Sequence, residues 1–476
     1  MSGIFGAVST KSGKSCITDL FFGTDYNSHM GDAFTGLAIP GLKPDIHRLT
    51  AQFKSKFEGI IEEDGYKDAE AGIGVISADE EQPLEVYSNF GKFSICADGR
   101  IGNLEELTQK LFAEGHSFSQ LGHSKNVRPN SIELAGKIIA QEQGIIPGIE
   151  KLMDMITGSL SILLVNDKRV YAARSKYGQS PLMIGIKKDA LAVTGESCAF
   201  NNLGFKPMKE LKSGEIVLLT QDGLKQKKEG NGISKICAFL WVYTGYPASN
   251  YEGINVEVAR YECGRALARR DMEDENFKPD FAAGVPDSGI AHAIGYSNEA
   301  KLPFKRPLVK YNDGYGRSYI PPTQEERELV AQMKLIAIEA IANEQSMVLM
   351  EDSIVRGTQL KSYTLTKLKD AGAREVHVRP ACPPLMFPCP YNVSTKAMPE
   401  LITRRMIKEL EGTMEPDNIE KYLDPDSPEY KRMINSIAED IGVTSLRYQR
   451  CGDMVKAIGM PADKVCTYCW TGKQVK

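Results

Sequence analysis

The sequence predicts an α/β protein in two parts, a β-rich layered unit over residues 2–228 followed by a parallel α/β unit over residues 229–476. Three observations support this prediction. The first half contains short apolar runs separated by Gly, Asn and Asp, which is typical of β-sheet. The second half alternates helical patterns with short apolar strands, which favours a parallel sheet. Residues 221–235 are polar and lack an apolar period, so they predict a connector between the two.

The composition is that of a globular protein and excludes several classes of partner. The chain has 476 residues, 42% hydrophobic and 25% charged, enough for two or three domains with substantial cores. Its 58 basic and 62 acidic residues are interspersed, so we expect neither nucleic acid nor an anionic membrane as a partner. The N-terminus MSGIFGAVST does not look like a secretion signal, and no stretch reaches about 18 apolar residues. We therefore expect a cytoplasmic protein.

The individual elements follow from local patterns. Strands are predicted in the first half at 159–165, 170–173 and 215–219. In the second half the helical patterns cover 256–269 and 324–343. Between and after these helices we predict the strands of the parallel sheet at 281–285, 307–310, 347–350 and 375–378.

The clearest chemical signal follows the predicted strand 347–350. Glu351 and Asp352 come directly after it, where paired carboxylates can hold sugar hydroxyls and a cation. The small residues of the next loop, 353–358, allow backbone N–H groups to converge on a phosphate at the start of a helix near Gln359. The alternative is an acidic strand end followed by an ordinary helix cap. The Gly-Lys pair of a Walker loop is absent.

Two further segments favour a phosphorylated ligand. The loop Val285–Gly289 also follows a strand and precedes a helix, although on its own it indicates only a turn. The glycine-containing segment 310–319 carries Lys310 and Arg317, so it is able to close over a substrate and exclude water. The alternative for this segment is a mobile surface loop.

The second half contains six specific motifs: VPDSG at 285–289, GRSYIPP at 316–322, EDSIVRGT at 351–358, AGAREVHVR at 371–379, PCPY at 388–391 and SLRY at 445–448. Through these motifs the chain resembles a known family, the glutamine phosphoribosylpyrophosphate amidotransferases, and the resemblance extends from Ser2 to Cys469. The resemblance implies an N-terminal-nucleophile hydrolase-like (αββα) glutaminase domain over 2–228. It also implies a type I phosphoribosyltransferase domain with a cluster-binding tail over 229–476.

The resemblance further implies a site for phosphoribosyl pyrophosphate and Mg²⁺. Carried over by position, Mg²⁺ is expected at Ser288, Glu351 and Asp352, and Arg317 is expected to take part in catalysis. The family usually has Asp-Asp where this chain has Glu351-Asp352. This difference keeps the negative charge and lengthens one of the two acidic side chains. The expected substrate contacts are Asp287, Ser288, Gly289, Lys310, Lys334, Glu351, Asp352, Ser353, Ile354, Val355, Arg356, Gly357 and Thr358.

Ten cysteines in a chain without a secretion signal are better interpreted as thiols or metal ligands than as disulfides. A terminal Cys-x-x-Cys with two distant partners suits either tetrahedral Zn²⁺ or a [4Fe–4S] cluster, and spacing does not separate them. Four buried thiols without metal are a third interpretation. The resemblance to one branch of the family favours the cluster, at Cys237, Cys389, Cys466 and Cys469.

The first half departs from the family at the glutaminase site. Ser2 stands where the family has its nucleophilic cysteine, and a hydroxyl ionises far less near neutral pH than a thiol of pKa about 8.5. The family's glutamine-binding arginine segment aligns with 77–80, and its oxyanion segment aligns with Ala97-Asp98-Gly99-Arg100. Ser131 replaces an expected aspartate. We expect the fold to persist and the glutaminase activity to be weak or absent.

Three functions remain compatible with the sequence. The first is an amidophosphoribosyltransferase-like enzyme of purine biosynthesis that forms 5-phosphoribosylamine and pyrophosphate from ammonia, or from glutamine if Ser2 acts as the nucleophile. The second is a phosphoribosyltransferase with another acceptor, and the third is a non-catalytic sensor of phosphoribosyl pyrophosphate or a partner subunit. The family is usually oligomeric, so we also expect a homo-oligomer.

Overall fold

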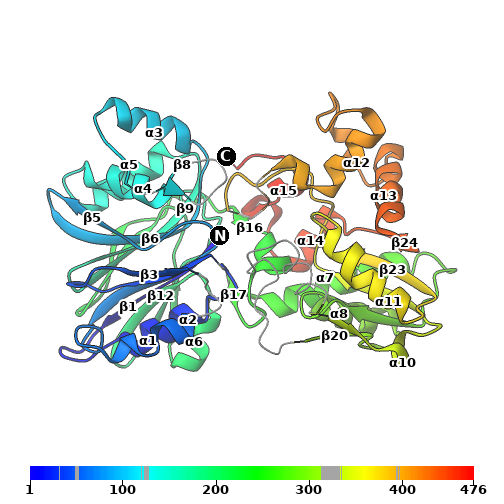
Figure 1. Ribbon diagram of the computed structural model, residues 1–476, viewed down its shortest axis with the longest axis horizontal. Coiled ribbons are helices and arrows are strands. Elements are labelled where there is room, and N and C mark those ends of the chain that lie inside the picture. The colour runs from blue at the N-terminus through cyan, green and yellow to red at the C-terminus, as the bar shows by residue number, and fades with distance from the viewer. Residues whose placement is uncertain are drawn as a thin grey trace.

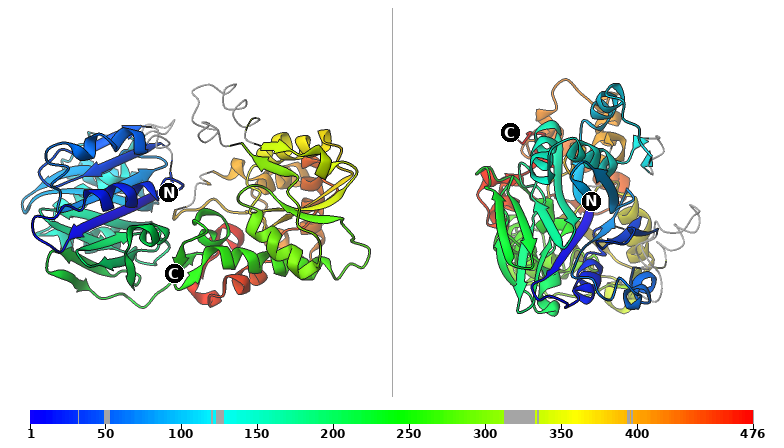
Figure 2. Two further views of the ribbon diagram at one scale, coloured as in Figure 1. Left: turned by 90° about the horizontal axis from the view of Figure 1, so that it is seen from below. Right: turned by 90° about the vertical axis from the view of Figure 1, so that its left-hand side faces the viewer.

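The chain forms two bodies that lie side by side, the first half on the left of Figure 1 and the second half on the right. The computed structural model describes residues 1–31, 33–48, 53–119, 121–122, 128–311, 333, 335–392, 395 and 397–475. A different orientation shows the same separation, with both chain ends drawn near the boundary between the bodies (Figure 2).

Two antiparallel sheets stack in the first body. One has the strand order β13 (Lys206–Glu210), β11 (Met183–Lys187), β12 (Ala190–Thr194), β1 (Ser2–Ser9), β4 (Ala71–Ser77), β2 (Phe34–Ala38) and β3 (Asp45–Arg48). The other has the order β15 (Gly223–Lys228), β14 (Ile216–Thr220), β10 (Arg169–Ala173), β9 (Gly158–Asn166), β6 (Gly91–Ile101) and β5 (Leu84–Ser88). A short hairpin, β7 (Leu121–Gly122) with β8 (Arg128–Pro129), lies outside them.

Helices cover the outer face of each sheet, which completes four layers (Figure 1). The first sheet carries α1 (Ile17–Asp25), α2 (Phe53–Phe57) and α6 (Cys198–Leu203). The second carries α3 (Leu104–Ala113), α4 (Ser131–Ala140) and α5 (Ile145–Met155). The αββα arrangement expected from the family resemblance is thus present.

Strand β1 shows how the sequence builds these layers. Successive side chains of a strand point to opposite faces. Phe5 and Ala7 therefore enter the core under α1, whereas Ile4 and Val8 enter the core between the two sheets. All eight residues of β1 are buried, which explains the continuous apolar run from Ile4 to Val8 in place of an alternation with polar residues.

The second body is built on a parallel sheet of order β19 (Phe281–Gly284), β22 (Ser346–Glu351), β23 (Glu375–Pro380) and β24 (Ser445–Leu446). Side chains of β19 and β22 alternate between two cores, one on each face of the sheet. The surrounding helices are α7 (Val256–Asp271), α8 (Ile290–Ala300), α10 (Glu339–Ala342), α11 (Thr366–Asp370), α12 (Ile402–Glu411), α13 (Pro428–Ile441), α14 (Cys451–Ile458) and α15 (Tyr468–Thr471).

Three expectations about local structure are wrong. The predicted strand 307–310 is β20 (Leu308–Lys310), but it pairs antiparallel with β21 (Leu335–Ala337) outside the parallel sheet. Within the predicted helix 324–343, residues 335–337 form strand β21, whereas Met333 and α10 are helical; residues 324–332 and 334 lie outside the described residues. The predicted connector contains β15, an edge strand whose exposed side chains are polar because its outer face meets solvent.

Side-chain contacts join the two bodies. Glu196 accepts a hydrogen bond from the hydroxyl of Tyr251 at 2.5 Å, and the hydroxyl of Ser197 accepts one from the backbone N–H of Asn250 at 2.7 Å. Burial favours a raised pKa for the Glu196 carboxyl, but the neighbouring His29 and the hydrogen bonds from Ser249 and Tyr251 hold that pKa below its usual value. The junction is therefore a specific polar interface rather than a loose tether.

Candidate functional site

The predicted carboxylate pair lies at the carboxyl end of β22, next to the loop that follows β19. The Ser288 hydroxyl donates to Oε1 of Glu351 at 3.0 Å, and the Ser353 hydroxyl donates to Oδ1 of Asp352 at 2.7 Å. Parallel pairing of β19 with β22 sets this proximity, because it places the carboxyl ends of both strands at one edge of the sheet. The three residues expected to hold Mg²⁺ are thus together.

Burial makes this carboxylate pair electrostatically costly without a cation. Burial, followed by the charge of Asp352, raises the pKa of Glu351 well above its usual value. Burial also raises the pKa of Asp352 to about 6, against the opposing effects of hydrogen bonds from Ser353 and Ser288 and the charge of Arg260. Two buried carboxyls that resist ionisation form a donor set suited to a hard divalent cation.

The loops beside the carboxylate pair depend on glycine at two positions. A Cβ at Gly289 would meet the backbone oxygen of Met350 at 2.2 Å, so only glycine allows the loop and β22 to approach this closely. Gly357 has a φ of +77°, a conformation that favours glycine at the turn of the 353–358 loop. Helices follow both loops, α8 from Ile290 and a π-helical turn, η4, over Leu360–Leu365, close to the predicted start at 359.

The structure places the predicted substrate contacts unevenly. Lys310 ends β20 and pairs with Asp287 at 3.1 Å, both exposed to solvent at the rim. Arg356 instead pairs with Glu400 and is largely exposed. Arg317 and Lys334 lie outside the described residues.

Sequence reasoning missed Arg260. Its guanidinium is 5% exposed, donates to the backbone oxygens of Trp241 and Gly245, and is the main positive charge acting on Asp352. An arginine on the buried face of α7, four residues after Val256 and seven before Leu267, was a signal in the sequence that a buried acid needs a partner.

The glutaminase position has a different chemistry. The backbone N–H of Ser2, which follows Met1, donates to Oδ1 of Asp98 at 2.7 Å, and the Gln82 side chain donates to the Ser2 hydroxyl at 3.0 Å. Ser2 and Gln82 line a cavity of about 290 Å³. A carboxylate thus lies directly against the nitrogen that would serve as general base in an N-terminal-nucleophile enzyme.

A second carboxylate fills the neighbouring part of this cavity. Glu80 is 7% exposed and accepts from the backbone N–H of Ser131 at 3.0 Å and from the Ser131 hydroxyl. Arg128 pairs with Glu80 at 3.4 Å. The position where the family resemblance predicts an aspartate is therefore occupied by a serine that binds a carboxylate of this chain.

Asp98 and Arg100, in the segment predicted to align with the family's oxyanion segment, contact the second body. Arg100 donates to the backbone oxygen of Cys389 at 3.1 Å, and the side-chain amide of Asn392 donates to Oδ2 of Asp98 at 2.9 Å. The backbone N–H of Asn392 also donates to the sulfur of Cys389 at 3.4 Å. Asp98 and Arg100 thus hold the turn that carries one of the predicted cluster ligands.

The four predicted cysteine ligands line one cavity. Cys237 in β16 (Ile236–Cys237) pairs in parallel register with Cys466 in β25 (Val465–Cys466), and Cys469 hydrogen-bonds with Cys389. Burial raises the pKa of the Cys466 thiol to about 12. Phe239, Tyr391 and Trp470 help to line the cavity. The donor chemistry fits a metal–thiolate group, although no group of three or more His, Cys, Asp or Glu within the described ranges meets the spacing for a single metal ion.

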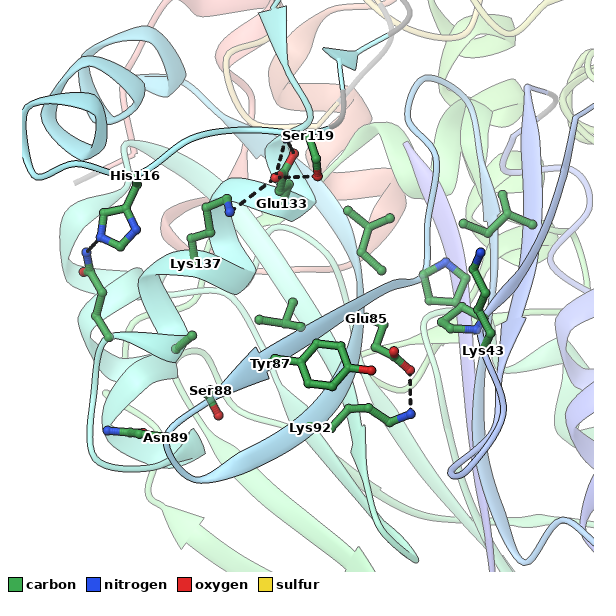
Figure 3. Close-up of a pocket in the computed structure, with 17 residues that line it drawn as sticks. Lys43, Glu85, Tyr87, Ser88, Asn89, Lys92, His116, Ser119, Glu133 and Lys137 are labelled. Atoms are coloured by element: carbon green, nitrogen blue, oxygen red, sulfur yellow. Dashed lines mark hydrogen bonds and ion pairs between the residues drawn. The ribbon is translucent and has the colours of Figure 1, made fainter.

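A larger cavity of about 1030 Å³ lies away from both sites, along edge strand β5 (Figure 3). Its charged groups largely satisfy one another: Lys92 pairs with Glu85 at 2.9 Å, and Lys137 pairs with Glu133 at 3.4 Å. Cavity volume alone therefore does not identify the functional site, because the strongly raised pKa values belong to the Glu351–Asp352 pair and to the cysteines.

Comparison with known proteins matches this geometry. A family profile described as a glutamine amidotransferase domain matches residues 69–202. The amidophosphoribosyltransferase of Bacillus subtilis (strain 168) is 30% identical over 449 residues, covering 93% of this chain and 86% of its own length. That of Methanocaldococcus jannaschii is 28% identical over 502 residues, covering 99% and 97%.

Solved structures give the same result. The glutamine phosphoribosylpyrophosphate amidotransferase of B. subtilis, complexed with ADP and GMP, superposes with a TM-score of 0.80 at 27% identity, covering 99% of this chain and 96% of that one. A structure described as the allosteric regulatory enzyme of purine biosynthesis gives a TM-score of 0.80 at 26% identity, covering 99% and 95%.

Fold and site together define a glutamine amidotransferase-like unit joined to a phosphoribosyltransferase unit. More specifically, the chain belongs to the amidophosphoribosyltransferase family. None of the helices in the described part of the chain has the length and apolar character of a membrane span.

Proposed function

We propose that this protein transfers the phosphoribosyl group of phosphoribosyl pyrophosphate to ammonia, forming 5-phosphoribosylamine and pyrophosphate, and that its glutaminase site does not supply that ammonia. The observation that carries the proposal is the buried pair Glu351 and Asp352 beside Ser288, at the carboxyl ends of two parallel strands. The family to which the chain belongs supports the reaction type.

Different groups of the site have different roles in the proposed reaction. Backbone N–H groups of the 285–289 and 353–358 loops bind the pyrophosphate and the 5-phosphate, and the carboxylates Glu351 and Asp352 orient the ribose hydroxyls. As the bond between C1 and the pyrophosphate oxygen breaks, that oxygen takes the bonding electron pair. The ammonia nitrogen forms a bond to C1 from the opposite face and then loses one proton to solvent.

We propose that Ser288, Glu351 and Asp352 hold Mg²⁺, which when bound neutralises charge on the departing pyrophosphate. The donor set is the observation that supports this, because two buried carboxyls with raised pKa values gain most from a cation. Arg317 and Lys334 are assigned to the same site through the family resemblance alone, since they lie outside the described residues.

The inactive glutaminase follows from two electrostatic features. With Met1 removed, Asp98 at 2.7 Å from the Ser2 nitrogen would stabilise a protonated α-amine and so remove the general base. The same carboxylate would repel the oxyanion of a tetrahedral intermediate, where loss of a single donor already costs roughly 3–4 kcal/mol. A serine hydroxyl in place of a thiol adds a third obstacle.

We further propose that Cys237, Cys389, Cys466 and Cys469 hold a [4Fe–4S] cluster with a structural role. Three separate segments meet through these cysteines, so a bound cluster would fasten the C-terminal tail to the start of the second body. Zn²⁺ uses the same donors, and iron and acid-labile sulfide content against zinc content in anaerobically purified protein separates the two. Domain limits of 2–228 and 229–476 and a homo-oligomeric state complete the proposal.

The test is pyrophosphate release from phosphoribosyl pyrophosphate and Mg²⁺, measured with glutamine, with an ammonium salt, and with neither. We expect turnover with ammonium only. Equal turnover with glutamine would contradict the inactive glutaminase while keeping the transferase. Absence of turnover with ammonium, in protein that still binds phosphoribosyl pyrophosphate, would contradict the transferase proposal and favour another acceptor or a sensor.

A further inference from the structure

Strand β5 differs from the other three edge strands of the two sheets in the first body. Proteins protect exposed edges with lysine, proline, other charged residues or a β-bulge, which discourage pairing with a further strand. Edge strand β13 carries Pro207 and two lysines, β15 carries three lysines, and both pair irregularly with their neighbours. Edge strand β3 carries Asp45 and Arg48. β5 instead has a regular register along its whole length and a single charged residue, Glu85.

The outer edge of β5 presents backbone groups for hydrogen bonding. The hairpin of β5 and β6 closes at the pair of Ser88 and Gly91, and only every second residue of an antiparallel strand bonds to its partner. Glu85 and Tyr87 therefore direct their N–H and C=O groups away from β6. Among the described residues no other segment forms backbone hydrogen bonds to these groups. An extended peptide can pair with such an edge as one more strand.

The cavity of about 1030 Å³ lies along this edge, and we name it the β5 groove. Figure 3 shows side chains of β5, α4 and the segment around Lys43 at its borders. Helix α4 packs directly on β5, since a Cβ at Gly136 would meet the side chain of Val86 at 2.6 Å. The five residues of β5 extend over about 17 Å. A strand of that length added in the β5 groove would contact α4 and the segment around Lys43 as well as the edge of the sheet.

The β5 groove carries an excess of positive charge. Lys43, Lys92 and Lys137 line it from three segments of the chain, whereas Glu85 and Glu133 are the only carboxylates among its described lining residues. Each of these carboxylates already pairs with a lysine, Glu85 with Lys92 and Glu133 with Lys137. Lys43 forms no ion pair within the part of the chain that the structure describes. An acidic side chain entering the groove would therefore find a lysine that no carboxylate of this chain neutralises.

We propose that the β5 groove binds an extended segment of a partner protein, with acidic and apolar side chains, as an additional strand of the sheet. Backbone hydrogen bonds to Glu85 and Tyr87 supply the affinity, and the excess positive charge favours acidic side chains. Apolar side chains of the segment also have partners, because Ile46 and Val86 line the groove and Tyr87 is 74% exposed. This role is separate from the proposed transferase reaction.

Fluorescence anisotropy of the full-length protein with a labelled peptide of about eight alternating valines and glutamates tests the proposal. We expect saturable binding that weakens about tenfold or more in Tyr87→Pro, because proline removes an outward N–H without breaking a bond to β6. Tyr87→Ala is the matched control, since it removes the ring and keeps the N–H, and it should retain most of the affinity. A peptide methylated on alternate backbone nitrogens should bind as poorly, which decides the question even if Tyr87→Pro does not fold.

The charge requirement has its own pair of variants. Lys43→Gln should weaken binding of the valine–glutamate peptide several-fold. Lys225→Gln removes the same charge from β15, the opposite edge of the same sheet, and should leave the affinity unchanged. A peptide of alternating valine and lysine should bind far more weakly to the unaltered protein.

Three results would overturn the proposal: no saturable binding, equal binding of the valine–lysine peptide, or an affinity unchanged in Tyr87→Pro. Sedimentation of the unliganded protein covers the remaining occupant. A molecular mass that falls in Tyr87→Pro but not in Tyr87→Ala would show that β5 pairs with a second copy of this chain, which would also contradict binding of a separate partner. Pyrophosphate release is a separate readout, so failure here leaves the proposed transferase activity untouched.

Discussion

Protons and Mg²⁺ compete for the carboxylates of Glu351 and Asp352, so the pH dependence of Mg²⁺ binding is a direct test of the transferase site. Mg²⁺ can bind both carboxylates only after their protons leave. With the pKa of Asp352 raised to about 6, the fraction of Asp352 available to a cation falls about tenfold between about pH 8 and about pH 5. Glu351, whose pKa is raised further, adds to this dependence. We therefore expect the Mg²⁺ affinity to fall at least about tenfold over this range.

The sign of the stability effect follows from the same shift. Because the folded pKa of Asp352 lies above its unfolded value, protonation stabilises the metal-free fold in acid, and this stabilisation is lost as the pH rises through about 6. A shift of about two pH units corresponds to about 3 kcal/mol of unfolding free energy. Mg²⁺ replaces the proton as counter-charge, so stabilisation by Mg²⁺ should grow from acid to neutral pH.

Thermal unfolding with and without Mg²⁺, followed from about pH 5 to about pH 8, measures both effects. Glu351→Gln removes one of the two charges and should abolish most of the Mg²⁺-dependent rise in Tm. Glu339→Gln, at an exposed position of α10, is the control and should behave as the unaltered protein. Mg²⁺ stabilisation that is equal at both ends of the pH range, or unchanged in Glu351→Gln, would refute the reasoning.

Three other predictions follow from single contacts. Arg100→Ala and Asn392→Ala should each speed the loss of visible absorbance of the proposed cluster in air, because each removes a contact to the turn that carries Cys389. Ammonium-dependent turnover of freshly prepared protein should stay unchanged. Rates of loss equal to that of the unaltered protein would show that these contacts do not support the turn. Ser2→Ala should leave ammonium-dependent turnover as it is, and a large drop would return Ser2 to catalysis. Arg379→Gln should lower the unfolding free energy by about 1.5–3 kcal/mol in chemical denaturation, because it removes the charge-assisted hydrogen bond of 2.6 Å to the buried carboxylate of Asp271, which keeps Arg447 at 2.7 Å as its partner. A change below about 1 kcal/mol would contradict this.

The parts of the transferase site that could be predicted are local in sequence. Glu351 and Asp352 follow an apolar strand, and the rule that ligands bind at the carboxyl ends of parallel strands places them beside Ser288 without knowledge of any other contact. The four-layer fold and the convergence of the four cysteines came from the family resemblance, since the cysteines lie far apart in the chain and spacing alone left zinc and a cluster equally open.

The features that could not be predicted depend on long-range pairing. β20 has the apolar pattern of a sheet strand, but which partner it chooses depends on β21, whose segment has a helical period and is a strand in the structure. Arg260 acts on Asp352 from a helix that lies about 90 residues earlier in the chain. Hydrophobic periodicity describes one helix or strand at a time, so it does not predict contacts between elements that lie far apart in the chain.

The charged residues at the predicted glutaminase position make contacts that indicate a structural role. If the oxyanion segment had simply decayed, its new charges would be expected to point into solvent, where charged side chains cost little. Instead Asp98, which is 6% exposed, accepts hydrogen bonds from Ser2 and Asn392, and Arg100 holds the backbone of Cys389. A buried charge is retained only when it is well paired, so these substitutions fit the segment to a new task, fastening the first body to the cysteine-bearing turn of the second. We therefore propose that residues 97–100 act as a structural clamp between the two halves of the chain.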